Sequence, residues 1–328
     1  HYNLSDTSPI LLKIAKISGQ LTGSINSLET TDQYDSYVDL MVAEAMDSFL
    51  IEGEHLNRET VRSSIKNYLN INEPVKRIND KKAAHTAALM VDVRKTFKEP
   101  LTQEKLFQWH QMVLPEVSLI RPNVVIGAWR NSSEPMQIVS GAIGYEIIHY
   151  QAPQSKNVAK LMSQFLEWFN DEINLTLPGP VRAAIAHLWF ETIHPFDDGN
   201  GRIGRAIVDK ALAQDLGKPA LLSLSSVLIK QKDDYYDHLH QASIGELEIS
   251  KWVSWFCKQV LQAQIDAMQS VKFVLQKSRF WNKNKNNDLN TRQVKMINKL
   301  FKAGHDGFEF GVSAKQYVSV TGCSKATA

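Results

Sequence analysis

Apolar residues recur at helical spacing along most of the chain, and this periodicity constrains the fold more than any other feature. Stripes with spacings of three and four residues run through 38–50, 161–169, 185–193, 203–212 and 252–260, and such spacing predicts amphipathic helices. The sequence shows neither a regular alternation of strands with helices nor a repeat of solenoid length. The chain is therefore predicted to be all-α.

Helix boundaries are marked by local signals. Ser155 is a plausible start for the helix over 161–169, and Pro180 sits where the first turn of the next helix is expected. Gly217 and Pro219 close the helix over 203–212.

Strand signals are few. Residues 123–126 and 136–140 are short and β-prone, and 146–150 follows a glycine-bearing turn at 141–144. The segment 136–150 is therefore predicted to be a small β-hairpin within the helical architecture.

Composition is that of an ordinary globular protein. Of the 328 residues, 43% are hydrophobic and 22% are charged, which argues against disorder and against a rod. No apolar run approaches the ~18 residues that a membrane span needs. Two cysteines cannot form a disulfide framework, and residues 1–21 lack the regions of a signal peptide. We therefore expect a cytoplasmic protein with no membrane partner.

The C-terminal part differs in charge from the rest. After residue 270, nine Lys and two Arg stand against three acidic residues, whereas the whole chain has a formal net charge of only +2. A polar, asparagine-rich linker lies within this part, at 282–290. The predicted regions are an N-terminal helical region at 1–90, a catalytic core at 91–270 and a C-terminal module at 285–328.

The C-terminal module has a helix-turn-helix pattern. A helical stripe at 294–301 is followed by a helix at 314–320, which Ser313 can cap, and then by a turn. Ser324 can cap a third helix, of which the sequence contains about one turn. A partial winged helix-turn-helix is therefore expected, with DNA as a partner of the intact module.

The stretch IHPFDDGNGRIGR, residues 193–205, carries the strongest chemical signal. A helix must end at its start, because Pro195 disfavours helical geometry at His194. The glycine-rich turn that follows offers backbone N–H groups at the start of the next helix, which is an anion-binding arrangement. An imidazole, a carboxylate for a hard cation and two guanidiniums therefore suit a nucleotide with Mg²⁺.

This stretch resembles the Fic signature H-x-F-x-[D/E]-G-N-G-R-x-x-R, and every specified position is filled. The resemblance implies the Fic (Fido) helical core and transfer of AMP from ATP to a Ser, Thr or Tyr hydroxyl of a target protein, with release of pyrophosphate. It implies that His194 is the general base and that Asp198 holds Mg²⁺. The other nucleotide-binding positions that it implies are Phe196, Gly199, Asn200, Gly201, Arg202 and Arg205.

Two further features extend the resemblance. The predicted hairpin lies where Fic proteins carry a flap that aligns the target segment by strand pairing, with Ile147 and Ile148 as candidate contacts. A hairpin that only covers the core explains the same residues.

Glu52 falls inside the apolar stripe of its helix, where an unpaired carboxylate is costly. The surrounding Ser48-Phe49-Leu50-Ile51-Glu52-Gly53 resembles the inhibitory Fic motif [S/T]-x-x-x-E-[G/N]. The resemblance implies that Glu52 pairs with Arg205 and blocks the γ-phosphate. A frayed helix end capped by Gly53 is the competing interpretation.

A zinc site is a competing interpretation of residues around His194. His187, Glu191 and His194 lie near one helix face and are of the types that bind zinc, but a zinc site leaves the adjacent phosphate cradle unexplained. His187 is therefore predicted to be a core or supporting residue, and Arg130 a structural arginine.

We thus expect an autoinhibited protein adenylyltransferase, with removal of AMP from a modified protein and a nucleotide-sensing DNA-binding regulator as alternatives. The expected partners are ATP with Mg²⁺, a target-protein hydroxyl, DNA and, in a homodimer, a second copy of the chain.

Overall fold

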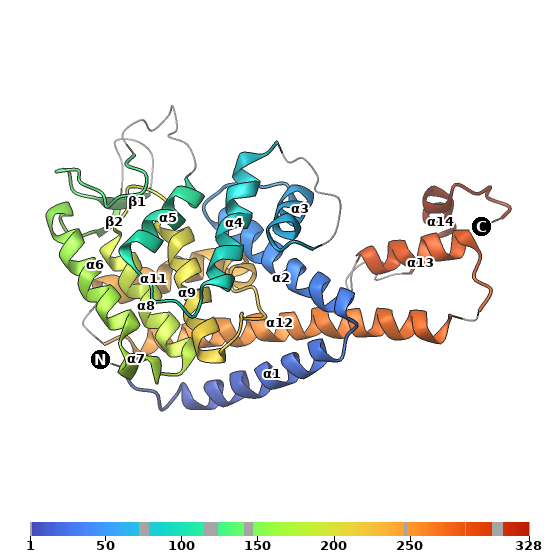
Figure 1. Ribbon diagram of the computed structural model, residues 1–328, viewed down its shortest axis with the longest axis horizontal. Helices are drawn as coiled ribbons and strands as arrows, with labels where there is room; N and C mark the ends of the chain where they lie inside the picture. Colours follow the sequence, from blue (N-terminus) through green and yellow to red (C-terminus); the bar gives the residue numbers. More distant parts are fainter. Residues whose placement is uncertain are drawn as a thin grey trace.

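The computed structural model describes residues 2–71, 79–114, 124–140, 147–245, 248–285, 287–303 and 311–327. As predicted, the fold is all-α (Figure 1). The first helices are α1 (Ser8–Asn26), α2 (Thr30–Ile51), α3 (Arg58–Tyr68), α4 (Lys81–Lys95) and α5 (Gln103–Val113). The middle of the chain contains α6 (Ser155–Asn170), α7 (Glu172–Leu175), α8 (Gly179–Ile193), α9 (Asn200–Leu216) and α10 (Ser225–Leu228). The rest comprises the 3₁₀ turn η1 (Ile229–Gln231), α11 (Lys232–Ile244), α12 (Ser250–Lys283), α13 (Thr291–Ala303) and α14 (Ala314–Thr321).

The predicted hairpin is present. Strands β1 (Gln137–Ser140) and β2 (Ile147–Gln151) pair antiparallel, and the register shifts between Ile138 and Val139. The β-prone segment 123–126 is not a strand over the part that the structure describes. The N–H of Val125 instead donates to the Asp197 carboxylate at 3.1 Å, so a side chain takes the hydrogen bond that a strand partner would need.

Helices α8 and α9 form the centre of the molecule. The side chains of Val181, Phe190, Ile203 and Ile207 are fully buried, and they belong to a core that continues into α2, α4, α5, α6 and α12. Because α8 is buried on most of its surface, its C-terminal end can deliver a side chain to an interior site rather than to solvent.

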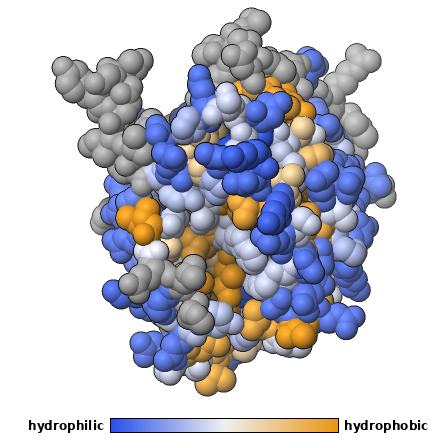
Figure 2. Space-filling view, turned by 90° about the vertical axis from the view of Figure 1, so that its left-hand side faces the viewer, coloured by the Kyte–Doolittle hydropathy of each residue, from blue (hydrophilic) through white to orange (hydrophobic). Residues whose placement is uncertain are grey.

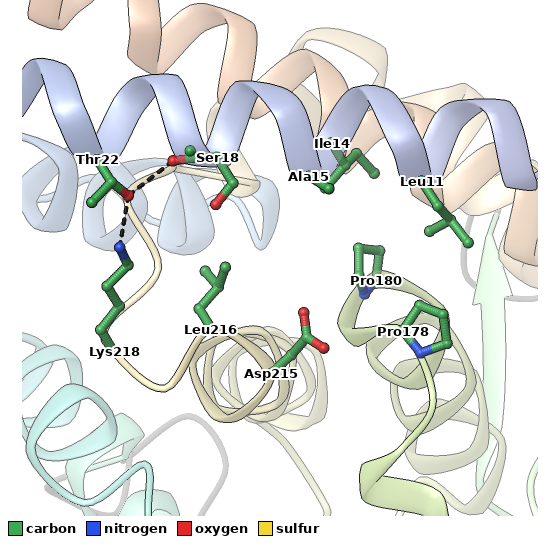
Figure 3. A pocket seen from close by; sticks show the side chains of 11 residues that line it. Leu11, Ile14, Ala15, Ser18, Thr22, Pro178, Pro180, Asp215, Leu216 and Lys218 are labelled. Atoms are coloured by element: carbon green, nitrogen blue, oxygen red, sulfur yellow. Dashed lines mark hydrogen bonds between the residues drawn. The ribbon is translucent and has the colours of Figure 1, made fainter.

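The N-terminal helix α1 lies along the long helix α12 (Figure 1). Leu21 and Ile25 of α1 pack against Ala267, Met268 and Val271 of α12. Between α1 and the ends of α8 and α9 lies a cavity of about 430 Å³ (Figure 3). Helix α1 is therefore packed closely against α12 and more loosely against the ends of α8 and α9.

The C-terminal helices extend from the far end of α12 (Figure 1). Asn290, the last residue of the predicted linker, accepts a hydrogen bond from the Gln293 N–H at 3.0 Å and so caps α13. Ser313 caps α14 through a capping box with Gln316. Residues 325–327 form a turn rather than the predicted third helix, with Thr327 N–H donating to the Ser324 carbonyl.

The face on the left of Figure 1 carries a band of apolar side chains between hydrophilic ones (Figure 2). In the part of the chain that the structure describes, we find no helix both long and apolar enough to cross a bilayer.

Candidate functional site

His194 stands at the C-terminal end of α8. Its backbone has φ 50° and ψ 61°, and its N–H donates to the Phe190 carbonyl at 2.9 Å. This left-handed conformation is uncommon for a residue with a side chain, and such strain gathers at functional sites. The conformation turns the chain out of the helix one residue before Pro195, as the sequence predicts.

Arg130 fixes this turn through main-chain contacts. Its Nε donates to the His194 carbonyl at 2.7 Å, and its backbone N–H donates to the Pro195 carbonyl at 2.9 Å. The guanidinium also donates to the carbonyls of Pro153 and Ile193. Arg130 is thus a structural arginine, as expected from the sequence.

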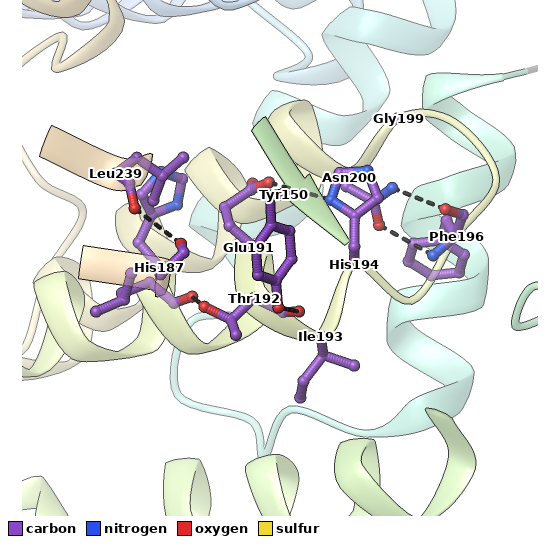
Figure 4. A network of polar contacts seen from close by, with 12 residues as sticks. Tyr150, His187, Glu191, Thr192, Ile193, His194, Phe196, Gly199, Asn200 and Leu239 are labelled. Atoms are coloured by element: carbon purple, nitrogen blue, oxygen red, sulfur yellow. Dashed lines mark hydrogen bonds and ion pairs between the residues drawn. The ribbon is translucent and has the colours of Figure 1, made fainter. Parts of the chain in front are cut away.

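Side chains of the loop after His194 hold the loop in its conformation. Asn200 accepts a hydrogen bond from the Phe196 N–H at 3.0 Å and donates to the Phe196 carbonyl at 2.8 Å. The buried ring of Phe196 stacks on His110 with centroids 4.1 Å apart, and His110 Nε2 lies 3.0 Å from the Asp198 carbonyl oxygen. The Asn200 side chain therefore shapes the loop (Figure 4).

The start of α9 offers the anion site. Gly199 has φ 85°, a conformation that glycine tolerates without strain. A Cβ at Gly201 would lie 2.3 Å from Glu52 Oε1. The carboxylate of Glu52 therefore rests directly over the glycine at the positive end of the α9 dipole.

Arg205 binds the end of α2. Its Nη2 donates to Glu52 Oε1 at 2.8 Å and to the Ser48 carbonyl at 2.7 Å, and its Nε donates to Ser48 Oγ at 2.8 Å. The Arg205 side chain is only 2% exposed. Burial opposes the guanidinium charge, but the charge and hydrogen bond of Glu52, together with Tyr235 and Tyr236, outweigh burial and raise the pKa of Arg205.

Glu52 is both the C-cap residue of α2 and the ion-pair partner of Arg205. It is the C-cap of α2, and Gly53 follows with φ 78°. The N–H of Glu54 then donates to the Phe49 carbonyl at 2.9 Å. The capping glycine and the carboxylate contact thus occur together: Gly53 turns the chain away at the end of α2, and the Glu52 side chain contacts Arg205 of α9.

Helix α2 is anchored a few residues before Glu52. The buried carboxylate of Glu44 accepts hydrogen bonds from the Ser223 hydroxyl and the Ser225 N–H, both at 2.9 Å, and from the Ser225 hydroxyl. Asp47 accepts another from the Ser226 hydroxyl. These contacts fix the helix that carries Glu52.

Arg202 pairs with two carboxylates. Its Nη1 donates to Glu54 Oε1 at 2.6 Å, and its Nη2 donates to Asp198 Oδ1 at 3.2 Å. Asp198 Oδ1 also accepts from the Gly199 N–H at 2.6 Å. Both signature arginines are therefore bound to acids from the segment that follows α2.

Buried polar groups lie beneath His194 (Figure 4). Glu191 Oε2 is 3.8 Å from His194 Nδ1. Burial and the nearby Glu52 charge raise the pKa of Glu191 to about 8. Burial lowers the pKa of His194 to about 4. The imidazole of His194 is therefore neutral near pH 7, which is the protonation state that a general base needs.

His187 lies deeper. Its Nε2 is 2.7 Å from the Tyr235 hydroxyl, and its ring is fully buried and stacked on Trp252. Burial lowers its pKa to about 3. Among the described residues no group of three His, Cys, Asp or Glu is placed to hold a metal, so the zinc interpretation has no geometric support.

Asp198 fits the Mg²⁺ expected with a nucleotide. Mg²⁺ in nucleotide enzymes is usually held by one or two carboxylates plus substrate phosphates. The Asp198 side chain is 31% exposed, next to the Arg202 guanidinium. A single carboxylate beside a guanidinium and the N-terminal end of α9 is a donor set that fits such a site.

The hairpin reaches α8 through Tyr150, whose hydroxyl donates to the Thr192 carbonyl at 2.7 Å. This contact places β2 beside His194. The side chains of Ile147 and Ile148 lie outside the described part of the chain, so their role as flap contacts stays a prediction.

Sequence reasoning missed Glu54, Lys82 and His110, and it did not assign Glu191 a place beside His194. Glu54 forms an ion pair with Lys82 as well as with Arg202. The available signal was that Glu54 lies two residues after Glu52, so a turn after α2 can bring both acids to the site.

The family comparisons agree with this geometry. Residues 100–212 match the Fic/DOC family, and residues 1–71 match a domain of unknown function (DUF4172). The protein adenylyltransferase fic-1 of Caenorhabditis elegans is 32% identical over 114 residues, which are 34% of this chain and 22% of that protein. The protein adenylyltransferase Fic of Drosophila melanogaster is 34% identical over 95 residues, 29% of this chain and 18% of that protein. The matches thus span about a fifth of these relatives.

Solved structures share the fold. A Fic family protein from Desulfovibrio desulfuricans superposes with a TM-score of 0.63 at 19% identity, covering 100% of this chain and 87% of that one. A Fic-domain signaling protein from Bacteroides thetaiotaomicron gives 0.59 at 21% identity, covering 79% and 97%. The family match over residues 100–212, together with the filled signature at residues 194–205, shows that this chain contains a Fic domain.

Proposed function

We propose that this chain is an autoinhibited protein adenylyltransferase that transfers AMP from ATP to a Ser, Thr or Tyr hydroxyl of a target protein. One observation is the main support for the proposal: the Glu52 carboxylate forms an ion pair with Arg205 and lies over Gly201. An internal carboxylate thus occupies the part of the site that a phosphate would need. The names of the curated relatives support the reaction class.

His194 would act as the general base. Its Nδ1 lies on the side of Glu191, which leaves Nε2 for the target hydroxyl. The imidazole takes the hydroxyl proton while the oxygen attacks the α-phosphorus. The new O–P bond forms as the bond to the β-phosphate oxygen breaks, and pyrophosphate leaves. Neutral His194 can accept this proton throughout the physiological pH range.

The α9 N-terminus and the two arginines would bind the triphosphate. Backbone N–H groups at Gly199 and Gly201 and the guanidiniums of Arg202 and Arg205 would neutralise its charge, which is the main catalytic contribution in phosphoryl and nucleotidyl transfer. Asp198 would hold Mg²⁺, whose charge further neutralises the phosphates.

The test uses α-labelled ATP and Mg²⁺ with the whole chain. We expect weak self-labelling by the wild type, strong labelling by Glu52→Gly, and no labelling by Glu52→Gly/His194→Ala. Glu29→Gln, at the other end of α2, is the matched control, because the Glu29 side chain makes no cap hydrogen bond. Equal labelling by Glu52→Gly and by Glu52→Gly/His194→Ala would refute the proposal. Release of AMP from a labelled target by wild type only would assign the reverse reaction instead.

A further inference from the structure

Glu54 forms an ion pair with Arg202, the first arginine of the signature, much as Glu52 does with Arg205, the second. The Arg202 guanidinium is 2% exposed, and its shortest ion pair, 2.6 Å, is with Glu54. Glu54 belongs to the segment after α2, 148 residues earlier in the chain than Arg202. A carboxylate at this distance from a buried guanidinium must leave or move aside before a phosphate oxygen can take the same N–H of Nη1.

Lys82 completes this cluster from a third element, α4. Its ammonium forms an ion pair with Glu54 Oε2, the oxygen that Arg202 does not use. Lys82 Nζ and the Arg202 guanidinium also lie 5.9 and 5.1 Å from the centre of the Phe49 ring. Two cations thus lie beside one carboxylate and one aromatic ring.

The charges of the site balance only with both glutamates present. Arg202, Arg205 and Lys82 contribute three positive charges, and Glu52, Glu54 and Asp198 contribute three negative ones. A triphosphate with one Mg²⁺ carries a net charge of about −2 near neutral pH, equal to that of two carboxylates. The charge of the bound nucleotide would therefore replace that of two displaced glutamates, Glu52 and Glu54, rather than that of one.

We propose that Glu54 is a second internal competitor of the nucleotide, acting on Arg202, and that Lys82 is a further phosphate-binding residue once Glu54 has moved aside. The inference rests on the proposed function and adds one regulatory and one binding residue to it. Glu52 and Glu54 flank Gly53, whose φ is 78°. Their side chains can leave the arginines while the Glu54 N–H stays bound to the Phe49 carbonyl.

The first experiment measures binding rather than transfer. The dissociation constant for a non-hydrolysable ATP analogue with Mg²⁺ is measured by calorimetry for Glu52→Gly and for Glu52→Gly/Glu54→Gln. We expect the double variant to bind about 3- to 10-fold more tightly, as for loss of one competing ion pair. Glu29→Gln in the Glu52→Gly background is the control and should leave affinity unchanged. Equal affinity of Glu52→Gly and the double variant would overturn the role of Glu54.

The second experiment tests Lys82 where Glu54 no longer neutralises it. In the Glu52→Gly/Glu54→Gln background, Lys82→Met should weaken binding of the analogue by about 3- to 10-fold. Lys95→Met is the matched control, because Lys95 lies thirteen residues further along α4, ~20 Å away, and donates to the Tyr68 carbonyl. If both lysine variants bind alike, Lys82 is not a phosphate-binding residue.

The outcomes separate the two proposals. Tighter binding by the double variant without AMP transfer would sustain the inference and refute the transferase proposal. Transfer by Glu52→Gly with no effect of Glu54→Gln would sustain the transferase and refute the inference. No binding by either variant would refute both. Thermal melting of each variant shows that it is folded before its binding is interpreted.

Discussion

Replacing Gly204 with alanine tests the close contact of α8 and α9 beneath the site. A Cβ at this position would lie 2.4 Å from Glu191 Oε1 and 2.9 Å from His187 Nδ1. The His187 ring cannot easily move, because it is fully buried and bound to Tyr235. Overpacking of this kind costs about 1–3 kcal/mol, whereas alanine in place of glycine in a helix gains about 1 kcal/mol. We expect these terms to give a net loss of up to about 2 kcal/mol.

The same substitution at Gly19 is the matched control. Gly19 is in the middle of α1, and a Cβ there would meet nothing within 4 Å. Gly19→Ala should therefore stabilise the protein by about 0.5–1 kcal/mol through helix propensity alone. Urea unfolding of the two variants should give midpoints on opposite sides of the wild type at equal slope. A Gly204→Ala variant that is stabilised as much as Gly19→Ala would refute the reasoning.

Two further predictions concern buried carboxyl groups. Glu44→Ala leaves the buried donors of Ser223 and Ser225 without their acceptor and should cost about 2–3 kcal/mol in urea unfolding; a loss below about 0.5 kcal/mol would contradict this. The pKa of Glu191 is raised to about 8 by burial and by Glu52, so the folded state holds its proton more tightly than the unfolded state. The contribution of Glu191 to stability is full below its unfolded pKa and is lost as pH rises towards 8. Glu191→Gln should therefore gain on wild type by up to about 1.4 kcal/mol per pH unit between pH 5 and 8, and a constant difference across that range would exclude the shift.

Local signals were sufficient for the helix ends of the site. Pro195 ends α8, and Gly217, with φ 65°, ends α9, because each residue restricts or permits a backbone conformation by itself. The position of Glu52 in an apolar stripe similarly indicated a carboxylate that needs a buried partner, and the structure supplies Arg205. These features depend on a few neighbouring residues and can be read from them.

Contacts between distant segments could not be read in this way. Arg130 binds carbonyls more than sixty residues away, and Lys82 reaches the site only because α4 packs beside the end of α2. The segment 124–126 has β-prone residues, but its backbone is bound by the Asp197 side chain. Its local propensity is overridden by a tertiary contact that no short window contains.

If Glu52 is inhibitory as proposed, the contacts of Arg205 would let this inhibition be released without dismantling the fold. Two of its hydrogen bonds are to Ser48, one to the hydroxyl and one to the main-chain carbonyl at the negative end of α2. Only the bond to Glu52 involves a side chain that is 28% exposed. A phosphate that displaces Glu52 therefore meets a guanidinium that Ser48 still orients, while Glu44 still anchors α2. Under the proposed mechanism, activation would require rotation of an acidic side chain and not removal of the helix that carries it.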